Sequence, residues 1–145
     1  MGTRGGRTMI FQLDIPIYGT NVLFVISPTK EEMDEFLSVK QNRQKLTEEE
    51  FTTLFTELDN TEYGGYTTPL DSGEYLVLIK GNYKDPVIFT HELFHVTNLI
   101  LFDREIEHTR TDEPYAYLLG WIAGQYCNYI KMEEEKQGNQ RNPEL

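Results

Sequence analysis

The sequence has little cysteine, little positive charge and no long hydrophobic stretch. Its single cysteine, Cys127, excludes an internal disulfide bond and a cysteine-rich zinc site. Only 13 lysine and arginine residues stand against 24 aspartate and glutamate residues, which gives a net charge of −11. Such an acidic chain repels phosphate groups, so we expect no nucleic-acid partner and no binding to an anionic membrane surface. No apolar run approaches a bilayer span and no signal core stands at the N-terminus, so we expect a cytoplasmic protein.

The composition is that of one globular domain. Hydrophobic residues make up 39% of the 145 residues and charged residues 26%, values typical of a folded chain with one core. The opening MGTRGGRT predicts a flexible tail over residues 1–8. A single domain is expected over 9–136. The polar end, which contains Gly138 and Pro143, predicts a second flexible tail over 137–145.

Alternating and β-branched runs predict the strands. Apolar residues over 10–17 and 22–26 flank the turn-forming sequence Tyr18-Gly19-Thr20-Asn21, which together indicate a β-hairpin. The nearly continuous apolar run over 74–80 predicts another strand. The sequence Tyr63-Gly64-Gly65-Tyr66 predicts a turn, or a flexible segment that covers a cleft.

Four helices are predicted by the capping residues at which they start, which are Thr29, Thr47, Asp85 and Asp112. The third helix is expected to run to about Phe102 and the fourth to about Lys136. Together with the strands they indicate an α+β fold. A small, twisted, mostly antiparallel sheet should pack on the third and fourth helices, with the helices on one side of it.

The third predicted helix contains the motif H-E-x-x-H as His91-Glu92-Leu93-Phe94-His95. Residues four apart lie one turn apart on the same helix face, so both imidazoles can bind one ion. Zinc suits two imidazoles and a carboxylate, with a fourth position left for water. The ion lowers the pKa of that water and polarises a carbonyl group, while Glu92 accepts the proton. Because the helix is apolar nearly all round, we expect it to be buried, and a metal would explain three polar side chains there.

A third metal ligand must come from further along the chain. Glu113 follows His95 with 17 residues between them and starts the last helix. His108 follows with 12 between, in a polar connection. The residues alone leave both candidates open. The third histidine of a metzincin, six residues beyond the second, is missing here because Leu101 stands at that position.

The arrangement of these residues resembles a known group of enzymes. An H-E-x-x-H helix followed by a helix that presents a glutamate is similar to the gluzincin zinc metallopeptidases in their minimal form. The chain also resembles small metallopeptidase-like proteins encoded by bacteriophages, through Ile15-Pro16-Ile17-Tyr18-Gly19 and Glu113-Pro114-Tyr115-Ala116-Tyr117-Leu118. The specific part of the resemblance covers about residues 74–124.

The resemblance implies a zincin-like fold and a Zn²⁺ cofactor. It implies His91, His95 and Glu113 as zinc ligands and Glu92 as the general base. A peptide or protein substrate would bind along the edge of a strand beside the metal, which we expect to be strand 74–80.

Supporting roles are predicted for residues near these ligands. Tyr117, one turn after Glu113, and His108 are the candidates to stabilise a developing oxyanion. Gly120 and Gly124 share a helix face with Glu113, and we expect them to let the last helix approach its neighbour closely. Trp121 and Leu118 are expected to lie in the core.

Three hypotheses for function follow from these features. The first is a zinc-dependent peptidase. The second is a zinc-binding interaction or assembly protein without turnover, and the third is a helical domain in which the motif arose by chance. Glu92 favours the first, because a purely structural zinc site has no use for a carboxylate beside an open coordination position. Oligomeric state does not follow from the sequence.

Overall fold

The computed structural model describes residues 9–26, 64–80, 82–106 and 112–141, together with positions 35, 38, 48, 52 and 56. Those five isolated positions are helical and exposed. The rest of the helices predicted from Thr29 and Thr47, the N-terminal tail over 1–8 and His108 lie outside the described residues. Neither of the two long helices described below combines the length and the hydropathy that crossing a membrane requires.

The sheet has four strands: β1 (Met9–Ile15), β2 (Thr20–Ile26), β3 (Gly64–Pro69) and β4 (Tyr75–Lys80). Their order is β1-β2-β4-β3. The predicted hairpin is confirmed: β1 and β2 pair antiparallel around a short 3₁₀ helix, η1 (Pro16–Tyr18), and the left-handed Gly19 at φ 61°. β2 and β4 are parallel, whereas β3 and β4 are antiparallel. The sheet is therefore mixed, with antiparallel pairing in two of its three contacts.

The prediction of a turn or flexible segment at 63–66 is wrong. Residues 64–69 form β3, which pairs with β4 along its whole length, from Gly64 opposite Lys80 to Pro69 opposite Tyr75. β3 has no apolar alternation to reveal it, since its sequence is GGYTTP. As a result β4 is an interior strand, which agrees with the burial of every residue from Tyr75 to Ile79. The strand edge nearest the motif belongs to β3 and not to the predicted strand 74–80.

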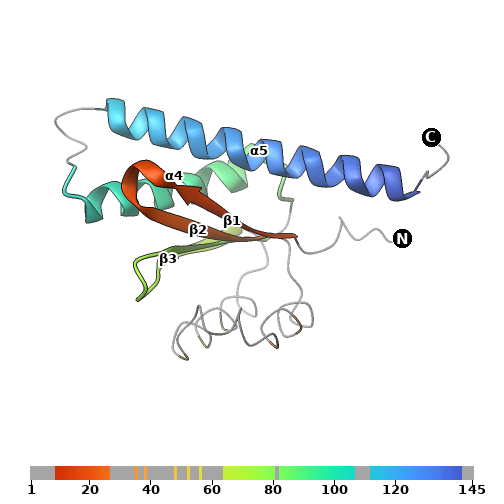
Figure 1. Cartoon of the computed structure of the whole chain (residues 1–145), viewed down its shortest axis with the longest axis horizontal. Helices are drawn as coiled ribbons and strands as arrows, with labels where there is room; N and C mark the ends of the chain where they lie inside the picture. Colours follow the sequence, from red (N-terminus) through yellow and green to blue (C-terminus); the bar gives the residue numbers. More distant parts are fainter. Residues whose placement is uncertain are drawn as a thin grey trace.

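Two helices pack on one face of this sheet (Figure 1). Helix α4 (Pro86–Asp103) begins where predicted, because the side chain of Asp85 accepts a hydrogen bond of 2.9 Å from the backbone N–H of Val87. It packs against β3 and β4. Helix α5 (Glu113–Arg141) packs against α4, and Tyr129 of α5 stacks on Phe11 of β1. The core lies between the sheet and these two helices.

Helix α5 differs from its prediction in three respects. It continues to Arg141, so residues 137–141 are helical and not part of a tail. A Cβ atom at Gly120 or Gly124 would meet nothing within 4 Å, so these glycines do not bring α5 close to a neighbouring element of the fold. Trp121 is 42% exposed and not in the core, whereas Leu118 is buried as expected.

A polar cluster fixes the end of α4 to the β1–β2 hairpin. The hydroxyl of the buried Tyr75 donates to Asp103 and accepts from Arg104 Nη1 at 3.1 Å. Arg104 Nη2 also donates to the carbonyl of Tyr18 at 2.8 Å. Burial raises the pKa of Tyr75, and the hydrogen bond with Asp103 raises it further. The neutral phenol therefore holds α4 in register with the sheet.

Candidate active site

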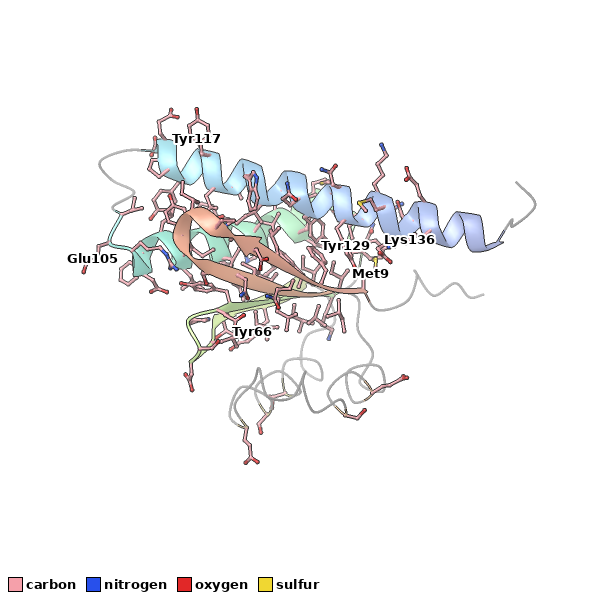
Figure 2. All side chains as sticks on the ribbon, in the orientation of Figure 1. Met9, Tyr66, Glu105, Tyr117, Tyr129 and Lys136 are labelled. Atoms are coloured by element: carbon pink, nitrogen blue, oxygen red, sulfur yellow. The ribbon has the colours of Figure 1, made fainter. Side chains whose placement is uncertain are left out.

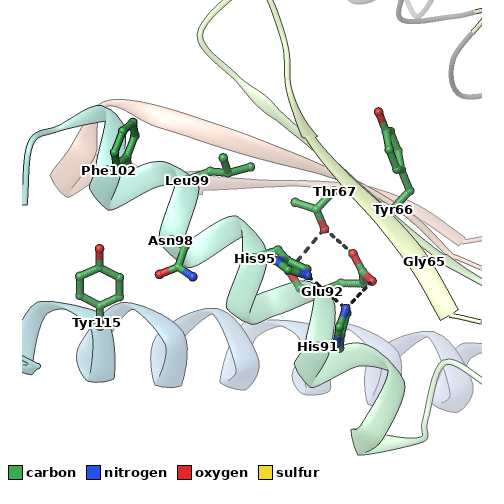
Figure 3. A pocket seen from close by; sticks show the side chains of 10 residues that line it. All are labelled: Gly65, Tyr66, Thr67, His91, Glu92, His95, Asn98, Leu99, Phe102 and Tyr115. Carbon is green, nitrogen blue, oxygen red and sulfur yellow. Dashed lines mark hydrogen bonds and ion pairs between the residues drawn. The ribbon is translucent and has the colours of Figure 1, made fainter. Parts of the chain in front are cut away.

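The motif residues of α4 lie beside the edge strand β3, where they form a pocket of about 490 Å³ that we call the site pocket (Figure 3). Its lining comes from three elements. These are Gly65, Tyr66 and Thr67 of β3; His91, Glu92, His95, Asn98, Leu99 and Phe102 of α4; and Tyr115 of α5.

The two imidazoles converge as their spacing predicts. His91 Nε2 and His95 Nε2 are 3.1 Å apart and the rings meet edge to face at 82°. Zinc–nitrogen bonds are about 2.0–2.1 Å long, so one ion bound to both nitrogens would see them at about 100°. That angle is close to the tetrahedral angle that zinc prefers. The pair therefore fits two neighbouring positions of a zinc site.

The prediction that both histidines are buried is wrong. His91 and His95 are exposed, and the side chain of His91 is 65% accessible. Helix α4 has an ordinary outward face on which Phe94 and Phe102 are also exposed, and these two phenylalanines made the sequence look apolar all round. Exposure leaves the imidazoles open to an ion and to a substrate.

Glu92 is the buried polar group of the motif, at 4% exposure. Thr67 Oγ1 donates to its Oε1 at 2.6 Å, and its Oε2 lies 3.9 Å from His91 Nε2. Figure 3 shows the carboxylate joined to Thr67 on one side and to His91 on the other. A buried carboxylate needs such partners, because without them its desolvation is costly. One oxygen of Glu92 is thus held by β3 and the other is directed toward the histidines.

Gly65 allows β3 to lie against this carboxylate. A Cβ atom there would be 2.2 Å from the carbonyl oxygen of Leu78 and 2.8 Å from Cγ of Glu92. Neither distance is possible for a real side chain, so the position requires glycine. The sequence analysis missed both Gly65 and Thr67. The available signal was a Gly-Gly pair in a strand-length segment, since glycine inside a strand often marks close backbone approach.

Two further lining residues were not predicted from sequence. Asn98 lies one turn beyond His95 on the same helix, which is a spacing the sequence contained. Tyr115 reaches the site pocket from α5, and its hydroxyl donates to the carbonyl of Ile106 at 3.3 Å. Together they give the pocket an amide and an aromatic side on the face away from β3.

The structure does not bring Glu113 and Tyr117 to the site pocket. Both line a different, mostly apolar pocket of about 630 Å³, which we call the outer pocket. The other residues that line it are Ile15, Pro16, Ile17, Tyr18, Pro114, Leu118 and Trp121. Helix geometry explains the separation: residues two apart point about 200° away from each other, so Glu113 faces away when Tyr115 faces the site pocket. Figure 2 shows Tyr117 directed away from the rest of the molecule.

The structure therefore unites three of the predicted site residues, His91, Glu92 and His95. Within the described part of the chain, no cluster of three histidine, cysteine or acidic side chains has metal-binding geometry. His108 is outside the described residues, so its predicted roles remain predictions. The roles of Glu113 as a ligand and of Tyr117 as an oxyanion donor also remain predictions, with both residues placed in the outer pocket.

A shallow apolar pocket flanks the histidines on their other side. Its lining consists of Pro86, Val87, Thr90 and Phe94 together with His91 and His95, and its volume is about 650 Å³. The imidazole pair consequently stands between the site pocket, which contains Glu92, and an apolar surface. Searches of protein-family models, of characterised proteins and of solved structures found no match to this chain.

Proposed function

We propose that this chain is a zinc-dependent hydrolase of peptide bonds, with His91 and His95 as metal ligands and Glu92 as the general base. One observation carries the proposal. The two Nε2 atoms lie 3.1 Å apart in an open pocket, and a buried carboxylate from the same helix turn lies 3.9 Å from one of them. The resemblance of the sequence to minimal gluzincins supports the same chemistry.

The protein side of the reaction follows from where each group is held. Zinc bound to the imidazoles would lower the pKa of a water molecule and polarise a substrate carbonyl. Glu92 is adjacent to that position and can accept a proton through Oε2, because Oε1 is already engaged by Thr67. Its position is fixed by packing against Gly65, so little reorganisation is needed when the proton moves.

The sheet edge supports an extended substrate. Within the described residues β3 is the last strand of the sheet, with β4 on one side only. A peptide can add to such an edge through backbone hydrogen bonds. Tyr66 and Thr67 of β3 line the site pocket, so a peptide on this edge would pass the histidines.

The third ligand is left open between the two residues that the sequence offers. Glu113 would need the first turn of α5 to rotate by about half a turn, because Tyr115 now occupies the side that faces His95. His108 is the alternative. Zinc affinity of Glu113→Ala and His108→Ala, measured by competition with a chelator, separates them, because the loss of a true ligand weakens binding by orders of magnitude.

The competing proposal is a zinc-binding interaction protein without turnover. Measurement of metal content together with digestion of a peptide library distinguishes the two. We expect zinc in the purified protein and cleavage of peptides. His95→Ala should lose the metal, whereas Glu92→Gln should keep the metal and lose cleavage. Glu74→Gln, a change outside the site pocket, serves as the control.

Two results would contradict the hydrolase. One is zinc binding by the wild-type chain with no cleavage of any library peptide, which favours the interaction protein. The other is unchanged cleavage by Glu92→Gln, which removes the general base from the mechanism.

A further inference from the structure

Helix α5 has a solvent-facing side that carries no charge between Glu113 and Lys131. This outer face is formed by exposed residues at helical spacing: Glu113, Ala116, Tyr117, Gly120, Trp121, Gly124, Cys127, Asn128 and Lys131. Between Glu113 and Lys131 the sequence contains no charged residue at all. A helix that meets water normally carries charge on that side, and an exposed apolar face marks an interaction surface.

The described residues cover this face only in part, where Glu113, Tyr117 and Trp121 line the outer pocket together with residues 15–18 of the hairpin. Tyr117 is 75% exposed and Trp121 42% exposed. Cβ atoms at Gly120 and Gly124 would point into open space. Two glycines near the middle of a long helix weaken it, yet here they serve no contact inside the molecule. They do leave a shallow surface onto which a second helix could pack closely.

We propose that the outer face binds the outer face of a second copy of this chain, with the two α5 helices antiparallel and crossing near Ile122. Ile122 itself is buried and only marks the level along the helix axis at which the two helices cross. In that arrangement, a residue that lies a given number of positions before 122 faces the residue of the second copy that lies the same number of positions after 122. Gly120 then meets Gly124 of the second copy, so these two small residues leave room for the helix axes to approach, with Trp121 beside the crossing. Tyr117 meets Cys127 of the second copy, and Ala116 meets Asn128 of the second copy.

Charge complementarity identifies the second copy as the partner. The same register places Glu113 opposite Lys131 of the second copy, and by two-fold symmetry this pair occurs twice. The two charged residues that border the uncharged stretch therefore have opposite charges across the interface when two copies of the helix pack antiparallel. A parallel pairing would put Glu113 against Glu113 and Lys131 against Lys131. Because the chain carries a net charge of −11, two copies repel least where their surfaces are uncharged.

The dimer does not require the proposed hydrolase activity. It uses Glu113 where the structure places it, on the side of α5 that faces away from the site pocket. Tyr115, which lines the site pocket, lies on the opposite side of the helix from the outer face. Dimer formation would therefore leave the site pocket open, and its test requires neither metal nor substrate.

Analytical ultracentrifugation of the full chain over a range of concentrations tests the proposal. We expect a reversible dimer. Gly124→Arg should raise the Kd of the dimer by more than about tenfold, because a long charged side chain then stands where the helices cross. Gly138→Arg is the matched control: it lies on the same helix, also faces open space, and is beyond the paired stretch. A wild-type chain that is monomeric at every soluble concentration, or equal effects of the two substitutions, would overturn the proposal.

Charge reversal tests the register and the orientation. Lys131→Glu and Glu113→Lys should each weaken the dimer by about five- to tenfold, because each creates two like-charged contacts. The double variant should recover the wild-type Kd, since the pairs are then restored with opposite sign. A double variant no tighter than either single one would exclude the antiparallel arrangement.

Discussion

The site pocket and the outer pocket each contain a glutamate, but the fold treats the two carboxylates differently. Glu92 is 4% exposed, held by Thr67 and packed against Gly65, where a Cβ atom would force β3 to shift. Glu113 is exposed and lines the apolar outer pocket. Tyr117 and Ile17, which line the same pocket, are exposed as well. A buried carboxylate is stable only where the structure supplies its partners. The difference indicates that positional constraint, and with it the proposed chemistry, is concentrated around Glu92.

Alanine in place of glycine should have opposite effects in strand β3 and in helix α5, and this is the largest contrast we expect. Gly65→Ala would put a methyl group against the carbonyl oxygen of Leu78 and Cγ of Glu92, so β3 must move. We expect a loss of about 2–3 kcal/mol in the free energy of unfolding, as for overpacking in a core. Gly120→Ala, with open space around it, should gain about 0.5–1 kcal/mol from helix propensity.

Urea unfolding of both variants followed by circular dichroism measures this contrast. The variants are matched, since each adds one methyl group to a glycine. Equal effects on unfolding would show that β3 does not pack against Glu92 as described. A gain in the free energy of unfolding for Gly65→Ala would also contradict the packing of β3 against Glu92.

Removal of the hydroxyl group that holds Glu92 should have the next largest effect. Thr67→Val keeps the shape of the side chain but leaves Oε1 of Glu92 without its donor at 2.6 Å. We expect a loss of about 1–3 kcal/mol in stability, the range for an unsatisfied buried group. Peptide hydrolysis should fall while zinc content stays unchanged, because the general base loses its orientation.

Thr68→Val is the control for that change. Thr68 is the next residue of β3, and its hydroxyl donates to the carbonyl of Pro69 at 3.2 Å and not to Glu92. We expect its effect on stability to stay within about 0.5 kcal/mol. If the two valine variants unfold at the same urea concentration, the bond between Thr67 and Glu92 contributes nothing and the comparison of the two carboxylates fails.

The polar cluster of Tyr75 connects helix α4 to the outer pocket, because Arg104 links the end of α4 to Tyr18. Tyr75→Phe removes the hydroxyl that donates to Asp103 and accepts from Arg104. We expect it to lower stability by about 1 kcal/mol at neutral pH, the usual net value of a hydrogen bond.

The pH dependence of this effect has a definite sign. The pKa of Tyr75 is raised in the folded protein, so the folded state holds the phenolic proton more tightly than the unfolded state does. The contribution of Tyr75 is therefore complete below its ordinary pKa of 10.0 and decreases as pH rises through the higher folded value. The difference in unfolding free energy between wild type and Tyr75→Phe should shrink above about pH 10. A difference that grows with alkaline pH would contradict this account of the cluster.

The contrast between the pockets also shows how far sequence reasoning could reach. The convergence of His91 and His95 depends only on the four-residue repeat of one helix, and it was predicted correctly. The bond from Thr67 to Glu92 joins segments 25 residues apart, and no local pattern encodes it. The turn predicted at Gly64-Gly65 failed because β3 is defined by its pairing with β4 and not by its own side chains.

The position of Glu113 depends on how α5 is rotated about its axis. Helical spacing places Gly120 and Gly124 on one face with Glu113, and Tyr117 one turn after Glu113. In the structure these four residues do share an exposed face. The error was to direct that face inward. The opposite stripe of Leu118, Ile122, Tyr126 and Ile130 is the buried one, and its burial fixes the rotation of the helix. These larger apolar residues are the sequence signal that shows which of the two faces of α5 is buried.

Substitution in the outer pocket should have the smallest effect, which completes the contrast. Tyr117→Phe removes a hydroxyl from a side chain that is 75% exposed and lies outside the site pocket. We expect stability to change by less than about 0.5 kcal/mol and the rate of peptide hydrolysis to stay within about twofold of wild type. Initial rates on the best library peptide and urea unfolding give both values. A large fall in kcat with unchanged KM and zinc content would show instead that Tyr117 acts on the transition state, as its sequence position predicts. That result would require α5 to turn during the reaction, and it would place Glu113 beside the histidines as well, because the two side chains lie one turn apart on the same face.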